Sequence, residues 1–303
     1  MVLILGVDAG GTASKAVVVA PDGTVLGRGT AGPGNPSAVG SAAAVAIGKA
    51  VREALGPHDP GGVVAGVVGV AGVSILADPG VATAFTDQWT DIGLTCPVEV
   101  VADVVTAFAA GTTATSGRVL IAGTGAVAAF IDGPRIERVV DGLGWLLGDE
   151  GSGLWLGLQA VRHTARHWSS SGLAVRVALH AGAASADDLV HWAQRLPLGS
   201  FAALAPVVCE FAAAGDPAAT TIVGAGVERL IATLDALDAP DAAVVLGGGL
   251  LSGDTPVRAG VLQALRARGG EIGTAHDPAL GAARLALRGL SLQGRSSRTA
   301  TST

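Results

Sequence analysis

Asp8 is the first residue in the chain whose type and setting could serve chemistry. It follows the apolar run 3–7, which is too short for a helix, and it precedes Gly10, Gly11 and Thr12. Glycine amides can approach phosphate oxygens closely because no Cβ stands between them. A carboxylate among such oxygens is tolerable only with a divalent cation between them. The stretch therefore predicts a phosphate loop with Asp8 at a metal ion; the alternative is a tight β-turn whose amides bond Asp8.

Asp103 is the acid best placed to act as a base. It ends the predicted strand 98–102 and precedes a predicted short helix over 104–110. A carboxylate at the carboxyl end of a strand points into the crevice where open α/β sheets bind ligands. The same spacing would also suit a helix N-cap, so both interpretations of Asp103 remain open.

A second turn of glycines and a threonine, Gly123-Thr124-Gly125, follows the predicted strand 119–122, as Gly10-Gly11-Thr12 follows the first strand. We call these two turns the glycine corners. It matches G-x-G-x-x-A, but a dinucleotide site would need a helix next, and residues 126–133 have the pattern of a strand and a hairpin turn. No G-x-x-x-x-G-K-[ST] sequence occurs either. We therefore reject the dinucleotide site and the P-loop.

Two adjacent acids, Asp149 and Glu150, lie in a glycine-dense stretch over 141–152. Carboxylates can accept paired hydrogen bonds from sugar hydroxyls, although both acids could instead cap the helix predicted from Ser152 to about residue 168. Trp145 lies between glycines and could form one wall of a ligand pocket.

His163 and His167 are four residues apart, but without a third ligand they are better explained as a solvated or partly buried pair than as a zinc site.

These motifs are positioned by an α/β pattern that occurs twice. A strand, a glycine–hydroxyl corner, a strand, a turn and a third strand are predicted over 3–30 and again over 119–140. Further strands are expected at 63–73, 98–102, 242–246 and 271–274, and helices at 35–55, 79–92, 185–195, 200–214, 217–237, 256–268 and 278–290. Two such units facing each other would enclose a nucleotide's phosphates from both sides. Residues 291–303 are predicted to be disordered.

Composition narrows the function. The chain has 303 residues, enough for two lobes, and 50% of them are hydrophobic. A net charge of −6 without a basic run argues against nucleic acid as the partner. Two cysteines give no disulfide framework, and the start has no signal-peptide pattern. No stretch is suited to spanning a bilayer, so we expect a soluble, cytoplasmic protein.

Together these residues resemble the N-acetylglucosamine kinase and BadF/BadG/BcrA/BcrD-type ATPase family, within the superfamily of sugar kinases, heat-shock chaperones and actin. The resemblance covers about residues 2–290. The motifs that carry it are Asp8-Ala-Gly-Gly-Thr12, Asn35, Asp103, Gly123-Thr-Gly125, the stretch from Asp141 to Ser152, and Val245-Leu-Gly-Gly-Gly249.

The resemblance implies two actin-like (ribonuclease H-like) lobes, each a mixed five-stranded sheet with helices, and a cleft between them. The N-terminal lobe would be 1–112, completed by the helix 278–290, and the C-terminal lobe 113–277. It also implies an ATP- and Mg²⁺-dependent kinase that phosphorylates the 6-hydroxyl of a sugar, most closely N-acetylglucosamine, and a homodimer.

The resemblance also implies roles for single residues. Asp8 would hold Mg²⁺, and Asp103 would accept the hydroxyl proton. The remaining roles are sugar binding by Asn35, Asp103, Gly125, Trp145, Asp149 and Glu150, and ATP binding by Gly10, Gly11, Thr12, Lys15, Gly123, Thr124, Gly247, Gly248 and Gly249.

The chain departs from the animal kinases at one position. They carry Ser-Asn after Gly-Thr-Gly, and that Asn touches the sugar, whereas this chain has Ala126-Val127. Val127 cannot hydrogen-bond, so glucosamine or another hexose is an alternative substrate.

Two further alternatives keep the fold: an ATP-driven activator of a reductase or dehydratase that carries an iron–sulfur cluster, and a non-catalytic sugar sensor. Cys96 and Cys209 lie far apart in the sequence and away from the glycine loops, which argues against the cluster.

Overall fold

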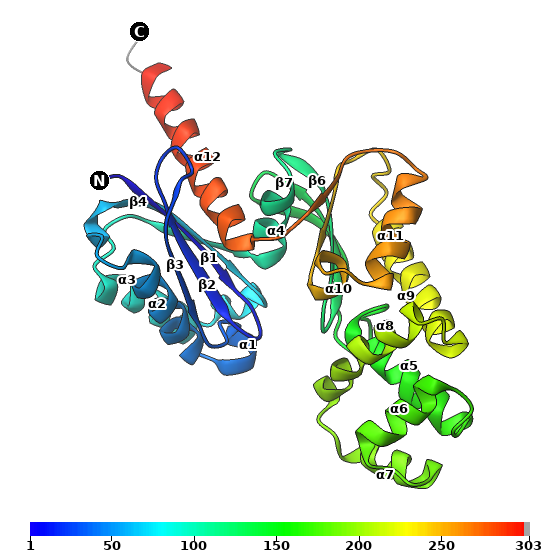
Figure 1. Ribbon diagram of the computed structural model, residues 1–303. Helices are drawn as coiled ribbons and strands as arrows, with labels where there is room; N and C mark the ends of the chain where they lie inside the picture. The colour runs from blue at the N-terminus through cyan, green and yellow to red at the C-terminus, as the bar shows by residue number, and fades with distance from the viewer. Residues whose placement is uncertain (300–303) are drawn as a thin grey trace. The chain divides into compact units, whose positions relative to one another are not determined.

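The computed structural model describes residues 1–299, and for Ser74, Leu198 and residues 292–299 it describes the backbone alone. These residues form two compact units (Figure 1). The first unit contains residues 1–115, 133–135 and 275–299, and the second contains residues 116–132 and 136–274.

The first unit is built on a five-stranded mixed sheet in the order β3-β2-β1-β4-β5. β1 and β2 are antiparallel, as are β2 and β3, whereas β1, β4 and β5 run parallel to one another. The strands are β1 (Leu3–Ala9), β2 (Ser14–Val19), β3 (Val25–Ala31), β4 (Val63–Val70) and β5 (Val98–Ala102).

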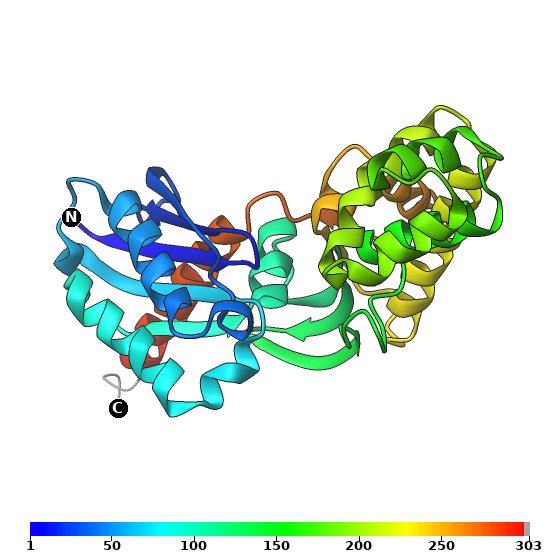
Figure 2. The ribbon, with the colours of Figure 1, turned by 90° about the horizontal axis from the view of Figure 1, so that it is seen from below.

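Helices cover both faces of this sheet, and Figures 1 and 2 show α2 and α12 on opposite sides of it. Leu3, Leu5 and Val7 of β1 point into a core shared with α2. On the other face α12 lies so close that a Cβ on Gly6 would fall 2.5 Å from the amide nitrogen of Ala283. The helices are α1 (Pro36–Val39), α2 (Ala42–Leu55), α3 (Pro79–Ile92), α4 (Asp103–Gly111) and α12 (Pro278–Thr299), with 3₁₀ turns η1 (Pro60–Gly62) and η2 (Val73–Ala77).

The second unit repeats the sheet of the first. Its order is β10-β9-β6-β7-β8, with β6 and β7 antiparallel and β6, β9 and β10 parallel. The strands are β6 (Ser116–Ala122), β7 (Ala126–Asp132), β8 (Arg135–Asp141), β9 (Val244–Gly247) and β10 (Ile272–Thr274). Two mixed five-stranded sheets with the same strand order confirm the repeated pattern predicted from the sequence.

Helices from the second unit pack into one large apolar core with β6, β7 and β9, and Figure 2 shows the green and yellow helices gathered together. Leu120 and Leu246 supply the sheet side of this core, and Leu156 and Leu230 the helix side. The helices are α5 (Gly153–Arg166), α6 (Gly172–Ala181), α7 (Ala186–Arg195), α8 (Ala205–Ala213), α9 (Pro217–Asp235), α10 (Gly249–Ser252) and α11 (Pro256–Arg266), with the 3₁₀ segment η3 (Leu198–Leu204).

Four predicted segments differ from the structure. The helix predicted over 200–214 is the 3₁₀ segment η3 followed by α8. The helix predicted over 35–55 is two helices, because Gly40 has a left-handed φ of 59° and ends α1. The strand predicted to run to residue 73 stops at Val70, since Gly72 has a φ of 71°. The prediction that the chain is disordered from residue 291 is wrong as far as Thr299, because α12 runs to that residue. Leu, Gln and Arg in this stretch are good helix formers. Residues 300–303 lie outside the described part.

No single helix among residues 1–299 has the length and apolarity to cross a membrane. One bent pair, Gly199–Ala213 with Pro217–Asp235, passes that test of length and composition when taken together, with an angle of 114° between its helices.

Candidate active site

Asp8 lies near the carboxyl end of β1, next to Gly69 of the parallel strand β4 and opposite Lys15 of the antiparallel strand β2. Side chains alternate along a strand, so Asp8 shares the face of Gly6, which is the face that α12 covers. Unlike Gly6, Asp8 retains partial exposure. Its carboxylate is therefore placed at the edge of the packed region, where a ligand can reach it.

The surroundings of Asp8 disfavour its charged form. Burial, the nearby carboxylate of Asp103 and, more weakly, that of Asp277 raise the pKa of Asp8 to about 6, and Lys15 opposes the shift. Two carboxylates that repel each other in a partly buried position need a cation to remain ionised together. A hard divalent ion that prefers oxygen ligands fits this site. With Asp8 as its one protein carboxylate, the ion would keep several of its water ligands.

Asp103 is the first residue of α4 and follows β5 directly, at the same edge of the sheet as Asp8. The helix N-cap is Ala102, so the N-cap interpretation of Asp103 is wrong. The side chain does accept a hydrogen bond from the Val104 amide, with an N–O distance of 2.9 Å. Burial raises the pKa of Asp103, which makes its carboxylate a stronger base than an exposed aspartate.

The first glycine loop is tied to a neighbouring loop that carries Asn35. Gly34 donates its amide to the Gly10 carbonyl at 3.0 Å, and a Cβ on Gly34 would fall 2.3 Å from Ser14 Oγ. Asn35 Oδ1 accepts a hydrogen bond from the Ser37 amide at 2.8 Å, so Asn35 is the N-cap of α1, as predicted. Gly11 stays exposed, and so does the neighbouring Thr12. The first unit thus brings together its predicted ATP-binding residues, its two acids and Asn35.

The second glycine corner contacts two other segments of the second unit. The carbonyls of Gly123 and Thr124 accept the first amides of α5, those of Gly153 and Leu154, at 2.7 and 3.1 Å. On the other side Gly248 lies against Ala122, so closely that a Cβ would fall 2.4 Å from the Ala122 carbonyl oxygen. A φ of 80° also requires glycine at position 248. The corner and the predicted adenosine turn at 247–249 are therefore neighbours.

Asp149 lies on the same corner. Its Oδ1 accepts the Ala126 amide at 3.0 Å, and a Cβ on Gly125 would fall 2.7 Å from that oxygen. Burial raises the pKa of Asp149, and Asp141 adds to the increase. The structure thus gathers Gly125 and Asp149, two of the residues predicted to bind sugar.

Asp141 has a role that the sequence analysis missed. Its two carboxylate oxygens accept the amides of Asp149 and Glu150, at 2.7 and 2.9 Å. Both Asp141 and Asp149 have left-handed backbones, with φ of 65° and 56°, a conformation that aspartate tolerates better than most residues. Asp141 therefore fixes the loop that presents Asp149. An acid eight residues before a second acid, across a glycine-dense stretch, is the signal that could have indicated it.

Two residues predicted to bind sugar lie apart from this cluster. Glu150 is directed to Arg229 of α9, with 3.4 Å between Oε2 and Nη1, and it lines a pocket between α5 and α9. Trp145 is 42% exposed, among exposed leucines of the same loop. Neither of them contacts Asp149 through a hydrogen bond between described residues.

Other candidate sites find less support. Among the described residues no group of three or more histidine, cysteine and acidic side chains could hold a metal ion. Cys209 is buried within α8 of the second unit, whereas Cys96 belongs to the first unit. Burial raises the pKa of both thiols, which disfavours the thiolate that a metal cluster needs.

Comparison with known proteins gives consistent results. The chain is 27% identical over 239 residues to an N-acetyl-D-glucosamine kinase of Dictyostelium discoideum, a match that covers 73% of this chain and 74% of the relative. The structure of a proposed N-acetylglucosamine kinase from Chromobacterium violaceum superposes with a TM-score of 0.75 and 28% identity, covering 94% of this chain and 99% of that one.

A glucokinase of the ROK family from Streptomyces griseus, solved with glucose and AMPPNP, superposes with a TM-score of 0.59 at 22% identity, covering 94% of this chain and 98% of that one. At that identity the likeness concerns the fold alone. The sequence model of the BadF/BadG/BcrA/BcrD ATPase family matches residues 5–286. The chain belongs to the BadF/BadG/BcrA/BcrD ATPase family.

Proposed function

We propose that this chain is an ATP-dependent sugar kinase, and that its substrate is N-acetylglucosamine, converted to the 6-phosphate. The observation that carries the proposal is the pair Asp8 and Asp103, two partly buried acids at one edge of the first sheet, beside a glycine loop and Lys15. The relatives named N-acetylglucosamine kinases support the choice of sugar, and family membership supports ATP as the phosphate donor.

In this proposal Asp103 accepts the proton of the attacking sugar hydroxyl. Its raised pKa suits a general base that must bind a proton during the reaction and release it afterwards. Phosphoryl transfer asks for little covalent chemistry from the protein, so alignment and charge stabilisation dominate. The Gly11 amide, the Thr12 hydroxyl and the Lys15 ammonium supply that stabilisation on the phosphates. Gly10 shapes the loop beside them, since its own amide donates to the Ala13 carbonyl at 3.0 Å. Asp8 would hold Mg²⁺, which shields the phosphate charges when bound.

The second unit supplies the other contacts. Gly123 and Thr124 would meet phosphate oxygens, and Gly247, Gly248 and Gly249 would flank the adenosine. Asp149, held in place by Asp141, would accept hydroxyl bonds from the sugar, together with Asn35 of the first unit. Gly125 and Trp145 would complete the sugar contacts. Glu150 is also assigned to the sugar, and this role requires it to leave Arg229.

Val127 bears on the choice of sugar. It lies on β7, where its Cγ2 would be 3.0 Å from a Cβ placed on Gly142 of the acid loop. An apolar side chain there offers no hydrogen bond to an N-acetyl group or hydroxyl, so glucosamine or another hexose is the competing substrate within the same proposal.

The test is a coupled assay of ADP release with glucosamine, N-acetylglucosamine, N-acetylmuramic acid, glucose and mannose, followed by NMR assignment of the phosphorylated position. We expect the highest kcat/KM with N-acetylglucosamine and a phosphate on O6. Turnover confined to glucosamine would refute the choice of sugar alone. ADP release that is equal with and without any sugar would refute the kinase and favour the ATP-driven activator.

The family resemblance also suggests a homodimer. Light scattering coupled to size exclusion would test this, with twice the chain mass of 29.5 kDa as the expected result and a single-chain mass as the refuting one.

A further inference from the structure

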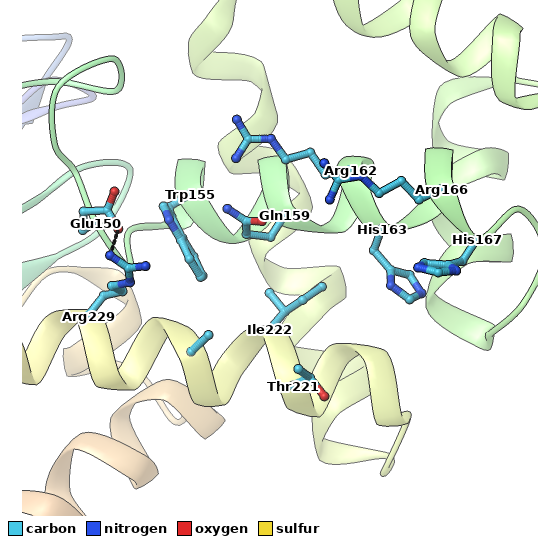
Figure 3. A pocket seen from close by; sticks show the side chains of 11 residues that line it. Glu150, Trp155, Gln159, Arg162, His163, Arg166, His167, Thr221, Ile222 and Arg229 are labelled. Atoms are coloured by element: carbon cyan, nitrogen blue, oxygen red, sulfur yellow. Dashed lines mark ion pairs between the residues drawn. The ribbon is translucent and has the colours of Figure 1, made fainter.

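A pocket of about 500 Å³ lies between α5 and α9 of the second unit. Figure 3 shows the two helices as its walls, with Trp155 and His163 pointing from α5 towards α9. The lining positions 155, 159 and 163 of α5 and its C-cap at 167 are spaced by four, so they form one stripe along the helix. The volume falls within the roughly 300–1,000 Å³ that is usual for small-molecule sites.

The pocket is cationic in a protein that is acidic as a whole. Arg162, Arg166 and Arg229 line it against one acid, Glu150, which leaves a charge of +2 with the imidazoles neutral. A phosphate monoester carries about −1.5 to −2 at neutral pH. Arginine forks match phosphate oxygens in geometry as well as in charge. The charge of the pocket therefore complements a single phosphate group rather than a neutral ligand.

Two histidines add donors to the same wall. The rings of His163 and His167 lie side by side, with 5.0 Å between their centres. His163 Nε2 is buried and has no hydrogen-bond partner among the described residues, which is costly for a polar atom. A phosphate oxygen at the ring would accept its hydrogen bond. Burial and, less strongly, the neighbouring His167 lower the pKa of His163, and Asp216, the N-cap of α9, opposes the shift, so the ring meets the phosphate as a neutral N–H donor.

The rest of the wall suits the organic part of such a ligand. Trp155 and Ile222 offer apolar surface, and Gln159 offers an amide between them. An indole face packs well against the C–H groups of a sugar ring. Inorganic phosphate alone would leave much of the volume unused, so the pocket favours an esterified phosphate.

We propose that the pocket between α5 and α9 binds a small phosphate monoester, of which a sugar phosphate is the preferred class. Arg166 and His163 hold the phosphate, and Trp155 contacts the sugar. Arg229 lies beside Trp155 at the other end of the pocket, where it pairs with Glu150, and so connects this pocket to the loop of Asp149. The site is distinct from the glycine corners and does not depend on the identity of the sugar that the chain phosphorylates.

NMR of the six histidine rings tests the proposal in the full chain. ¹⁵N-histidine protein is titrated with glucosamine 6-phosphate, with inorganic phosphate, and with chloride at matched ionic strength; H163Q and H167Q assign the two signals. We expect saturable shifts of the His163 and His167 signals with both phosphates, tighter with the ester, and none with chloride. His58 belongs to the first unit and serves as an internal reference.

Variants distinguish a site from general attraction. R166Q is expected to weaken the response at His163 roughly tenfold, as the loss of a charge-assisted contact would. Arg176 is exposed on α6 and lines neither this pocket nor the groove beside it, so R176Q should leave the affinity unchanged. Equal weakening by R166Q and R176Q would overturn the proposal.

The same titration in a D103N background tests whether the response depends on kinase turnover. The shifts should persist there, whether or not the chain proves to be a sugar kinase. If the His163 and His167 signals do not shift at millimolar phosphate ester, the proposed phosphate site is refuted, while the proposed function stays intact. A response to inorganic phosphate equal to that of the ester would refute the assignment of a sugar phosphate.

Discussion

Replacing Asp8 by asparagine should make the ligand-free protein more stable while it destroys activity. Asp8 keeps a charge that its surroundings oppose, because burial and the Asp103 carboxylate raise its pKa from 3.8 to about 6. Asparagine has nearly the same shape and no charge. Stability given up for function is common where an active site needs a buried charge.

The magnitude follows from linkage between protonation and folding. Between about pH 4 and 6 the folded state binds more protons at Asp8 than the unfolded state does, so stability falls as the pH rises through this window. Above pH 6 the full cost is present. The difference between 3.8 and about 6 corresponds to about 3 kcal/mol, which is an upper limit for the gain from D8N at pH 7.5. Below pH 4 the gain should vanish, because the carboxyl is then protonated in both states.

Urea unfolding at pH 7.5 and pH 4, without nucleotide or Mg²⁺, measures this difference. D22N is the matched control: Asp22 is an exposed turn residue that accepts the Thr24 amide, its pKa is lowered, and its replacement should not stabilise. A D8N protein no more stable than wild type at pH 7.5, or stabilised equally at both pH values, would show that the charge of Asp8 is not opposed as described.

Three further predictions address the site and the fold. D103N should reduce kcat by about 10²–10⁴-fold while ATP still binds, measured by ADP release and by calorimetry with ATP; near-full turnover would remove Asp103 as the base. D141A should raise the KM for sugar and cost about 1–3 kcal/mol, since it leaves the amides of Asp149 and Glu150 without their acceptor, and thermal melts with D141N as the conservative comparison would check it. G6V should destabilise the first unit by at least about 3 kcal/mol, because its side chain would overlap α12; unchanged protease resistance at the C-terminal helix would contradict the packing.

Local patterns predicted much of the fold. The run of apolar residues before Asp8 and the run before Gly123 both ended in a glycine and a hydroxyl, and both became central strands followed by a corner. Ser152 capped α5 as expected, because N-capping needs only a side-chain oxygen and an amide three residues ahead. Such features depend on neighbours in sequence, and so can be predicted from it.

Features that depend on distant residues were missed. Glu150 is predicted to bind sugar, and nothing in the sequence indicated that Arg229, 79 residues further on, pairs with its carboxylate. The helix α6 was missed as well, although Ser171 caps it and Gly182 ends it with a φ of 61°. One of its first amides, that of Leu173, is satisfied by Asp216, 43 residues away. The raised pKa of Asp8 likewise needs Asp103, which only the sheet brings near.

The fit of α12 on Gly6 has a consequence for biosynthesis. The strand β1 is covered by α12, which is made much later, so the first unit cannot close until residues near 279 and 283 have been made. The second unit is continuous in sequence except for residues 133–135, which belong to the first unit. It can therefore fold before α12 has been made. A released chain that ends at residue 274 would therefore hold one finished unit and one whose apolar sheet face stays open to chaperones.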